Sequence, residues 1–383
     1  MKAPRARMLI LLVSALVLAS CPLAAQQFPV PDQGPRFVFL FIGDGMGKAH
    51  VEASIIDQAE RGAPEGSVFE VFPVEGETAT NNALGGTTDS AAAATALATG
   101  SKTLNGKINV NPLGKILQPT ISRLSASAGR RVGVVSSVPL NHATPSAFYA
   151  FSDSRSDYYD IALQMLTSGF DYFGGGGILD PRGEGGTKPD IRDEAAKKGY
   201  RVLESRTELQ ALGSGDVRVI AFADPLDSDL SIPFLADRSA GGQSLSDFVA
   251  AGIRILDNPQ GFFLMVEGGK VDWASHDNDG PRMLGEMRDF DAAIRTALAF
   301  LKERPGETLV VVTADHETGG LSIADAGASI LGRLSWSKTG HSSARVPVFA
   351  QGAGEDLFTG SYDNTGLFLR LKALLEASLP GNP

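Results

Sequence analysis

The chain has 383 residues, of which 43% are hydrophobic, enough for one large α/β domain or for two to three smaller ones. It carries 34 basic and 44 acidic residues, a net charge of −10, and this balance argues against a nucleic-acid binder, which needs a basic surface. The charge does not exclude an anionic substrate, because a bound metal ion can outweigh the global charge locally.

The first 20 residues are expected to form a secretory signal peptide. The basic start MKAPRAR precedes the apolar run MLILLVSALVLAS, which is too short for a comfortable membrane span, and this order is typical of such a signal. The mature protein is therefore expected outside the cytoplasm. Residues 21–35 are expected to form a tether between the signal and the folded chain.

Cys21 is the one cysteine, which excludes an intrachain disulfide. It lies in LASC, which resembles the lipobox of bacterial lipoproteins, where the cysteine is lipidated and becomes the mature N-terminus. Lipidation would anchor the protein to a membrane of the bacterial envelope, whereas ordinary cleavage after Ala25 would release it into the periplasm. Both alternatives stay open. The sequence shows no second long apolar run, so no transmembrane helix is expected in the mature protein.

Apolar runs of strand length recur along the rest of the chain and predict strands that are covered on both faces. They lie at residues 36–45, 131–138, 217–223, 261–269, 308–316 and 346–352. Helical patterns lie between them, at residues 89–99, 119–128, 154–166, 244–256 and 283–301. This alternation predicts an α/β sheet sandwich without a clean boundary that would split it. The glycines of DYFGGGGILD predict a tight turn at a strand end, since no Lys-Ser/Thr pair follows them as in a P-loop.

The first helical pattern begins at Asp89 and Ser90, in GGTTDSAAAATALATG. A helix start leaves N–H groups unpaired and carries a partial positive charge. Ser90 at this position either caps the helix or holds an anion such as phosphate. This segment alone leaves both interpretations open.

Three of the apolar runs end in candidate ligands. Asp44 ends FIGD, Glu267 follows in MVEGG, and Asp315 and His316 end VTADH. A single charged residue after a strand is normally an exposed turn. Because ligand sites of open α/β sheets lie beyond the carboxyl ends of the strands, three such ends together indicate one site.

A further metal-binding pattern is the pair Asp272 and His276 in EGGKVDWASHDND. On a helix, residues four apart lie on one face, as metal ligands require, although such a pair alone often lies on a solvated face. His341 precedes the last apolar run, and imidazole with carboxylate is the ligand set of zinc. His50 lacks such neighbours and is interpreted as a surface or helix-start histidine.

Six segments resemble, in order, the motifs of the alkaline phosphatase family. They are DGMG at Asp44, TTDSAAAATA around Ser90, HATPSAFYAFSDSR from His142 to Arg155, VEGGKVDWASH ending at His276, TADHETGG at Asp315–His316, and TGH at His341. The resemblance implies a three-layer α/β sandwich, with a large, mostly parallel central sheet flanked by helices, in a catalytic domain over residues 36–383. It also implies hydrolysis of small phosphate monoesters through a phosphoserine intermediate.

The resemblance further implies a role for each site residue. Two Zn²⁺ and one Mg²⁺ would be bound, the first zinc by Asp272, His276 and His341, the second by Asp44, Asp315 and His316, and the magnesium by Asp44, Thr144 and Glu267. Ser90 would be the nucleophile and Arg155 the phosphate clamp. A zinc ion can bind a serine alkoxide directly, so no Ser–His–Asp triad is needed. Asp89 is expected to orient Arg155 rather than to bind metal.

The chain departs from some family members near the third metal, with His142 where they carry Asp and Trp273 where they carry Lys. The missing acid predicts a weaker third site. The stretch between His316 and His341 is short where many relatives insert a large crown at the dimer interface. A reduced crown is therefore expected, and the question of a homodimer stays open.

Two alternatives to a phosphomonoesterase stay open. One is a phosphodiesterase of the same superfamily, although such relatives usually carry Thr in place of Ser90. The other, from a different class, is an inactive phosphate- or metal-binding lipoprotein. A sulfatase is disfavoured, because AAAA follows Ser90 without the Pro and Arg of the sulfatase motif.

Overall fold

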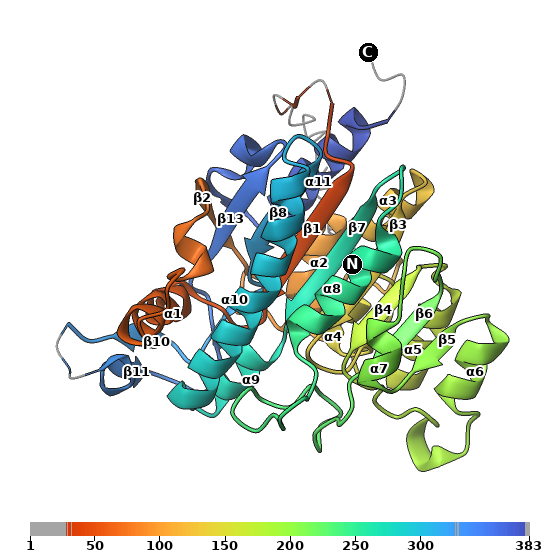
Figure 1. Cartoon of the computed structure of the whole chain (residues 1–383), viewed down its shortest axis with the longest axis horizontal. Coiled ribbons are helices and arrows are strands. Elements are labelled where there is room, and N and C mark those ends of the chain that lie inside the picture. The colour runs from red at the N-terminus through yellow and green to blue at the C-terminus, as the bar shows by residue number, and fades with distance from the viewer. Residues whose placement is uncertain (1–27, 29, 32, 326, 328, 380–383) are drawn as a thin grey trace, which may run out of the picture.

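The computed structural model describes residues 28–379 except 29, 32, 326 and 328 (Figure 1). The expected signal peptide and Cys21 lie outside the described residues. Of the segment expected to be a tether, Phe28 lies against the guanidinium of Arg370, 4.9 Å from the ring centroid to Cζ, and the Pro35 carbonyl accepts a hydrogen bond from Arg130. The last part of that segment therefore contacts the folded chain.

One ten-stranded sheet forms the centre of the fold, in the order β14-β2-β13-β8-β1-β7-β3-β4-β6-β5 (Figure 1). β13 runs antiparallel to both of its neighbours and all other adjacent pairs are parallel, which confirms the mostly parallel sheet. The strands are β1 Phe37–Gly43, β2 Val74–Ala79, β3 Arg131–Ser136, β4 Tyr172–Gly175, β5 Arg201–Leu203, β6 Val219–Phe222, β7 Phe262–Gly268, β8 Thr308–Thr313, β13 Val346–Gly352 and β14 Gly360–Asp363.

The central strands are apolar along their length because helices cover the sheet on both faces. In β1, Phe39 and Phe41 join one hydrophobic cluster, whereas Val38, Leu40 and Ile42 join a second cluster on the opposite face. All seven residues of β1 are buried. The expected three-layer sandwich is thus confirmed.

Helices from both halves of the chain supply the two outer layers. On the face of Phe39 the clusters include α1 Lys48–Glu60, α7 Arg206–Gln210, α8 Leu245–Leu256, α9 Lys270–His276 and α10 Gly280–Glu303. On the opposite face they include α2 Ser90–Thr99, α3 Ile121–Ser127, α4 Ala143–Ser146, α5 Tyr158–Thr167, α6 Ile191–Lys197 and α11 Thr365–Ala377. Short 3₁₀ turns lie at Val68–Glu70, Glu184–Gly186, Ile330–Gly332 and Glu355–Phe358.

Helix boundaries differ from the sequence pattern where capping decides them. The helix expected from residue 283 begins three residues earlier, since the Asp279 side chain accepts a hydrogen bond from the Arg282 N–H at 3.0 Å and caps α10. The helix expected from residue 154 begins only at Tyr158. β4 ends at Gly175 within the run of four glycines, in agreement with the turn predicted there.

The described part of the segment between His316 and His341 contains short strands and the 3₁₀ turn Ile330–Gly332, and no α-helix. β9 Glu317–Thr318 pairs with β12 His341–Ser342, and β10 Leu321–Ile323 pairs with β11 Leu334–Trp336. The β9–β12 pair holds the two histidine-bearing ends of this segment side by side. Within the part of the chain that is described, no helix is long and apolar enough to span a membrane.

Candidate metal centre

Three neighbouring strands bring the predicted ligands to one edge of the sheet. β1 lies between β7 and β8, and Ile42 pairs with Glu267 on one side and with Thr313 on the other. Asp44 follows β1, and Asp315 follows β8 two residues after its end. The register therefore places the strand-end acids side by side, as their positions in the sequence predict.

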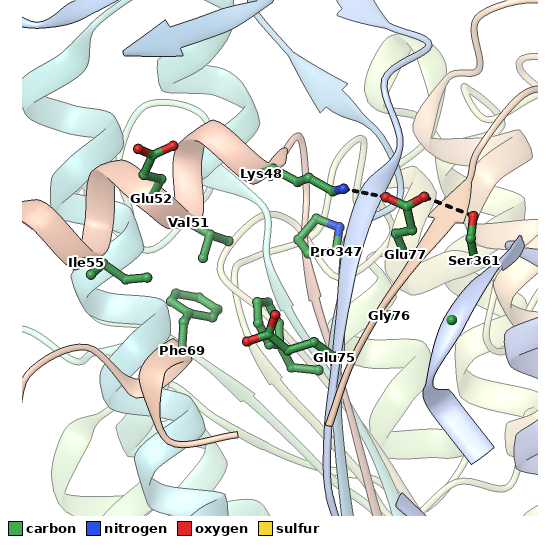
Figure 2. Close-up of a pocket in the computed structure, with 12 residues that line it drawn as sticks. Lys48, Val51, Glu52, Ile55, Phe69, Glu75, Gly76, Glu77, Pro347 and Ser361 are labelled. Atoms are coloured by element: carbon green, nitrogen blue, oxygen red, sulfur yellow. Dashed lines mark hydrogen bonds and ion pairs between the residues drawn. The ribbon is translucent and has the colours of Figure 1, made fainter. Parts of the chain in front are cut away.

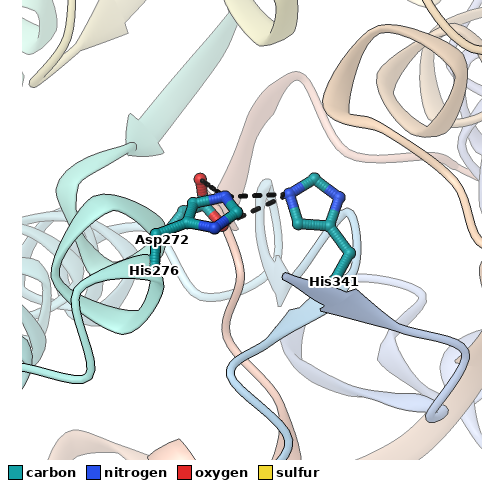
Figure 3. A group of neighbouring side chains, drawn as sticks. All are labelled: Asp272, His276 and His341. Carbon is teal, nitrogen blue, oxygen red and sulfur yellow. Dashed lines mark hydrogen bonds and ion pairs between the residues drawn. The ribbon is translucent and has the colours of Figure 1, made fainter. Parts of the chain in front are cut away.

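The first cluster consists of Asp272, His276 and His341 (Figure 3). α9 carries both Asp272 and His276, so the predicted helical spacing is present, with His276 Nε2 3.3 Å from Asp272 Oδ2. His341 faces them from β12, its Nε2 3.1 Å from His276 Nε2. The three side chains thus converge from two separate elements.

The histidine tautomers of this cluster suit a metal. His276 Nδ1 donates to the carbonyl of Thr339, and His341 Nδ1 donates to the carbonyl of Thr88 at 2.9 Å. The hydrogen bond to Asp272 raises the pKa of His276 to about 9, whereas burial lowers the pKa of His341. When both rings are neutral, as metal ligands must be, each carries its proton on Nδ1 and presents an unprotonated Nε2 to the other. Two facing lone pairs cannot hydrogen-bond to each other, whereas a cation between them would satisfy both.

The second cluster, Asp44, Asp315 and His316, is fully buried. His316 Nε2 lies 3.4 Å from Asp44 Oδ1 and 3.3 Å from Asp315 Oδ2. Neither oxygen of Asp44 has a hydrogen-bond partner among the described residues, and the same holds for Asp315 Oδ2. Unpaired carboxylate oxygens are costly in a protein interior, so these orphaned atoms fit a site built for a cation.

The electrostatics lead to the same conclusion. Burial, followed by the charges of Asp315 and Asp272, raises the pKa of Asp44 well above its ordinary value. Burial likewise raises the pKa of Glu267 to about 8, and burial with the Asp272 charge raises the pKa of Asp315 to about 6. These four carboxyl groups are at most 5% exposed. They can all be ionised at neutral pH only if positive charge is placed among them.

A third cluster comprises Asp44, His142 and Glu267. Glu267 Oε2 accepts a hydrogen bond from the Ser136 hydroxyl, while Oε1 and the buried Thr144 hydroxyl are unpaired within the described residues. Both free oxygen atoms are hard ligands of the kind that magnesium takes. His142, predicted from the sequence to lie near the third metal, thus lies among these ligands.

A hydrogen bond from Arg155 determines which nitrogen of the neutral His142 ring carries the proton. Arg155 Nη2 donates to His142 Nε2 at 3.2 Å, so the proton of the neutral ring lies on Nδ1. Burial and the Arg155 charge lower the pKa of His142 to about 3, which keeps the ring uncharged. His142 therefore brings no negative charge to the third cluster, and its buried Nδ1–H has no hydrogen-bond partner among the described residues. Trp273 packs against it edge to face, with ring centroids 6.0 Å apart.

The structure shows which residue caps the N-terminus of α2. Asp89 is the cap, since its Oδ1 accepts from the Ala92 N–H at 3.0 Å. Ser90 is the first residue of α2, and its hydroxyl lies 3.3 Å from His316 Nε2 in the second cluster. The serine hydroxyl is thus not used for capping and lies beside the metal ligands.

Asp89 also holds Arg155. Asp89 Oδ2 accepts from Arg155 Nη1 at 3.0 Å and from the Gly106 N–H at 2.9 Å. The expected orienting role of Asp89 agrees with this geometry. With Nη1 on Asp89 and Nη2 on His142, the guanidinium is fixed close to the start of α2.

Two supporting residues were not singled out from the sequence. The Thr318 hydroxyl donates to Asp272 Oδ1 and lies 3.3 Å from His316 Nδ1, so it links the first and second clusters. Ser136 holds Glu267. Thr318 lies two residues after His316 within TADHETGG, which was the available signal, whereas nothing in the sequence around Ser136 distinguishes it.

His50 lies in the first turn of α1, which agrees with the interpretation as a helix-start histidine. It is buried, so the alternative of a surface histidine is wrong. Its Nδ1 accepts from the Gly47 N–H at 3.1 Å, and its Nε2 lies 3.0 Å from the Ser275 hydroxyl. His50 therefore anchors α1 to α9 and takes no part in the clusters.

A separate hollow of about 560 Å³ lies between α1 and the strands β2 and β13 (Figure 2). Lys48 and Glu77 form an ion pair at its edge, and Glu77 Oε1 accepts from Ser361 at 2.9 Å. No predicted site residue is among the described residues that line it. The chemistry predicted from the sequence belongs to the clusters at the strand ends instead.

The fold and the clusters define an α/β protein with a candidate metal centre at the carboxyl ends of its central strands, and the comparisons give its family. The sequence pattern of the alkaline phosphatase family matches residues 36–334, and the chain belongs to this family. It is 33% identical to alkaline phosphatase 4 of Bacillus subtilis over 299 residues, 75% of this chain, and spans 62% of the length of that relative.

Solved structures resemble the chain over most of its length. The alkaline phosphatase from the Antarctic bacterium TAB5 superposes with a TM-score of 0.79 at 32% identity, covering 90% of this chain and 99% of that one. A variant of the TAB5 enzyme, with a histidine replaced by glutamate and Mg bound in its M3 site, superposes with a TM-score of 0.77 at 30% identity, covering 90% and 98%.

Proposed function

We propose that this protein hydrolyses small phosphate monoesters through a phosphoserine at Ser90 and releases inorganic phosphate outside the cytoplasm. The observation that carries the proposal is the position of Ser90. Its hydroxyl is left free by the Asp89 cap and lies 3.3 Å from His316 Nε2, beside buried carboxylates that require a cation. Family membership supports the same activity.

Two Zn²⁺ and one Mg²⁺ are the proposed cofactors. The first two clusters combine imidazole and carboxylate, the ligand set of zinc, whereas the third offers oxygens from Asp44, Thr144 and Glu267, as magnesium prefers. The Mg bound in the M3 site of the TAB5 variant supports a magnesium site in this chain. Bound metals would stabilise the negative charge on the entering and leaving oxygens of an in-line displacement.

The residues of the chain supply binding and the nucleophile. Arg155 presents a planar fork suited to two phosphate oxygens, and the N–H groups at the start of α2 add anion stabilisation. The Ser90 oxygen attacks phosphorus, its proton leaves to solvent, and the bond from phosphorus to the leaving oxygen breaks. The leaving alcoholate takes a proton from solvent. A water molecule then attacks phosphorus and gives up a proton to solvent, and the bond from phosphorus to the Ser90 oxygen breaks. The Ser90 oxygen takes up a proton from solvent, and inorganic phosphate is released.

The comparisons favour neither alternative, the phosphodiesterase or the inactive lipoprotein. A direct assay separates them. The purified protein should contain zinc and should hydrolyse a chromogenic phosphomonoester best at alkaline pH. Chelation should abolish the activity, and zinc with magnesium should restore it. Full activity in protein verified to be metal-free, or hydrolysis of diesters in preference to monoesters, would contradict the proposal.

We also propose that residues 1–20 are a signal peptide, that 21–35 tether the catalytic domain 36–383, and that Cys21 is lipidated. Mass spectrometry of the mature N-terminus tests this proposal. A lipid-modified Cys21 is expected, and an unmodified N-terminus at Gln26 would show ordinary release into the periplasm instead. The proposed partners are small phosphomonoesters and not nucleic acid.

A further inference from the structure

A pocket of about 320 Å³ lies beside the predicted phosphate clamp, near the lower end of the size range of small-molecule sites. His142, Tyr158 and Trp273 line it with three rings. His142 lines the pocket and its Nε2 lies 3.2 Å from Arg155 Nη2, so the pocket adjoins the guanidinium that is proposed to bind phosphate. Tyr158 begins α5 three residues after Arg155. A group attached to the bound phosphate therefore has this pocket within reach.

Aliphatic side chains complete the wall, and one of them has an unusual backbone. Leu179 and Leu230 line the pocket together with Pro139. Leu230 has a φ of 58°, a left-handed conformation that bulky residues rarely adopt because the side chain crowds the backbone. Such strain persists only where the surroundings enforce it, and it is often found at functional sites.

Buried polar contacts enforce the conformation of this turn. Asp227 Oδ1 accepts from the N–H groups of Asp229 and Ser231 at 3.0 and 2.8 Å, and its Oδ2 pairs with Lys270. Lys270 is completely buried and also donates to the Ile232 carbonyl at 3.0 Å. Because Lys270 begins α9, which carries Trp273, the contacts fix the Leu230 turn relative to the opposite wall of the pocket.

We propose that this pocket receives the leaving group of the substrate and selects phosphomonoesters whose leaving group carries an aromatic ring. The inference rests on the proposed function and adds a substrate class to it. Rings and aliphatic groups on the walls favour a flat apolar partner. The exposed carboxylate of Asp229 also lines the pocket and disfavours leaving groups that carry a further negative charge.

The test compares benzyl phosphate with ethyl phosphate on the metal-loaded protein. Both are esters of primary alcohols of similar leaving ability, so a difference in kcat/KM reports contacts to the ring. The wild-type protein should favour benzyl phosphate by about tenfold, as expected for burial of part of a phenyl ring. Leu230→Gly should lower kcat/KM for benzyl phosphate about fivefold, mainly through KM, and leave that for ethyl phosphate within about twofold.

Leu230→Gly suits this test because glycine adopts a positive φ freely, so the side chain is removed from the wall while the backbone conformation of the turn is kept. Arg218→Gly is the matched control, since exposed Arg218 has a φ of 57° and does not line the pocket. Its preference for benzyl phosphate should equal that of the wild type. Leu230→Ala provides a second variant, with the same expected loss.

Calorimetry with benzylphosphonate and ethylphosphonate tests the pocket without turnover. The wild type should bind benzylphosphonate more tightly than ethylphosphonate, and Leu230→Gly should lose this difference. That result would support the role of the pocket in binding an aromatic group even if neither ester is hydrolysed. In that case only the proposed function would fail. The wild type and both Leu230 variants could instead hydrolyse the two esters with the same preference and bind the two phosphonates equally. That result would refute the proposed role of the pocket, and the proposed hydrolase activity would stand.

Discussion

Arg155→Ala tests the phosphate clamp. The guanidinium is fixed by Asp89 at 3.0 Å and by His142 at 3.2 Å, with its fork close to the start of α2. Loss of a charge-assisted contact to an anion costs about 1.5–3 kcal/mol, which corresponds to about 10- to 150-fold weaker binding of phosphate. The assay is the competitive inhibition constant of inorganic phosphate.

The same substitution should disturb folding little. Arg155 is 24% exposed on its side chain, and partly exposed ion pairs contribute about 0–1 kcal/mol. After the substitution Asp89 keeps its hydrogen bonds from Ala92 and Gly106, so no carboxylate is left unpaired. Arg201→Ala, which removes an exposed pair with Asp216, is the control for loss of an arginine away from the site. Unchanged inhibition by phosphate in Arg155→Ala would refute the assigned role.

Two further predictions concern His142 and His50. His142→Asp should tighten magnesium binding by about 10- to 100-fold and alter turnover, because it adds a negative charge beside Asp44 and Glu267. A magnesium titration of both proteins, with metal analysis, measures the two affinities. Equal affinities would show that His142 does not influence the third metal. Burial lowers the pKa of His50 to about 3, so the folded protein keeps it neutral while the unfolded chain binds a proton below pH 6.5, and stability is lost as the pH falls. In urea unfolding, wild type should therefore lose about 1.7 kcal/mol relative to His50→Gln between pH 6.5 and 5, and parallel pH profiles would contradict this.

The central strands could be predicted because both of their faces are buried. β1, β7 and β8 are apolar at almost every position, and their ends carry the acids that meet in the site. Strands at and next to the edges of the sheet carry no such signal, since β2, next to the edge strand β14, reads VEGETA, and the edge strand β5 has three residues. α1 was also missed, because its buried residues include His50, Ser54 and Asp57, which hide the apolar periodicity.

The site could be predicted where local spacing encodes it. Asp272 and His276 lie one helical turn apart, and Asp315 and His316 are adjacent. Contacts made between distant segments could not be predicted from one sequence. The His341 tautomer depends on the Thr88 carbonyl, 253 positions away, and Glu267 is held by Ser136.

The pocket beside Arg155 illustrates the same limit. Lys270 was visible within VEGGKVDWASH, but lysine is almost never fully buried, so its ion pair with Asp227 had no sequence signal. The left-handed conformation of Leu230 was equally hidden, since leucine is among the residues least expected there.

Trapping of the covalent intermediate tests the central claim most directly. The metal-loaded protein is mixed briefly with a phosphate-labelled monoester, quenched in acid and digested. The label should appear on the peptide that contains Ser90, and Ser90→Ala should neither be labelled nor turn over at a normal rate. An unlabelled Ser90 peptide together with near-normal turnover of Ser90→Ala would show that water attacks the ester directly, and would contradict the mechanism.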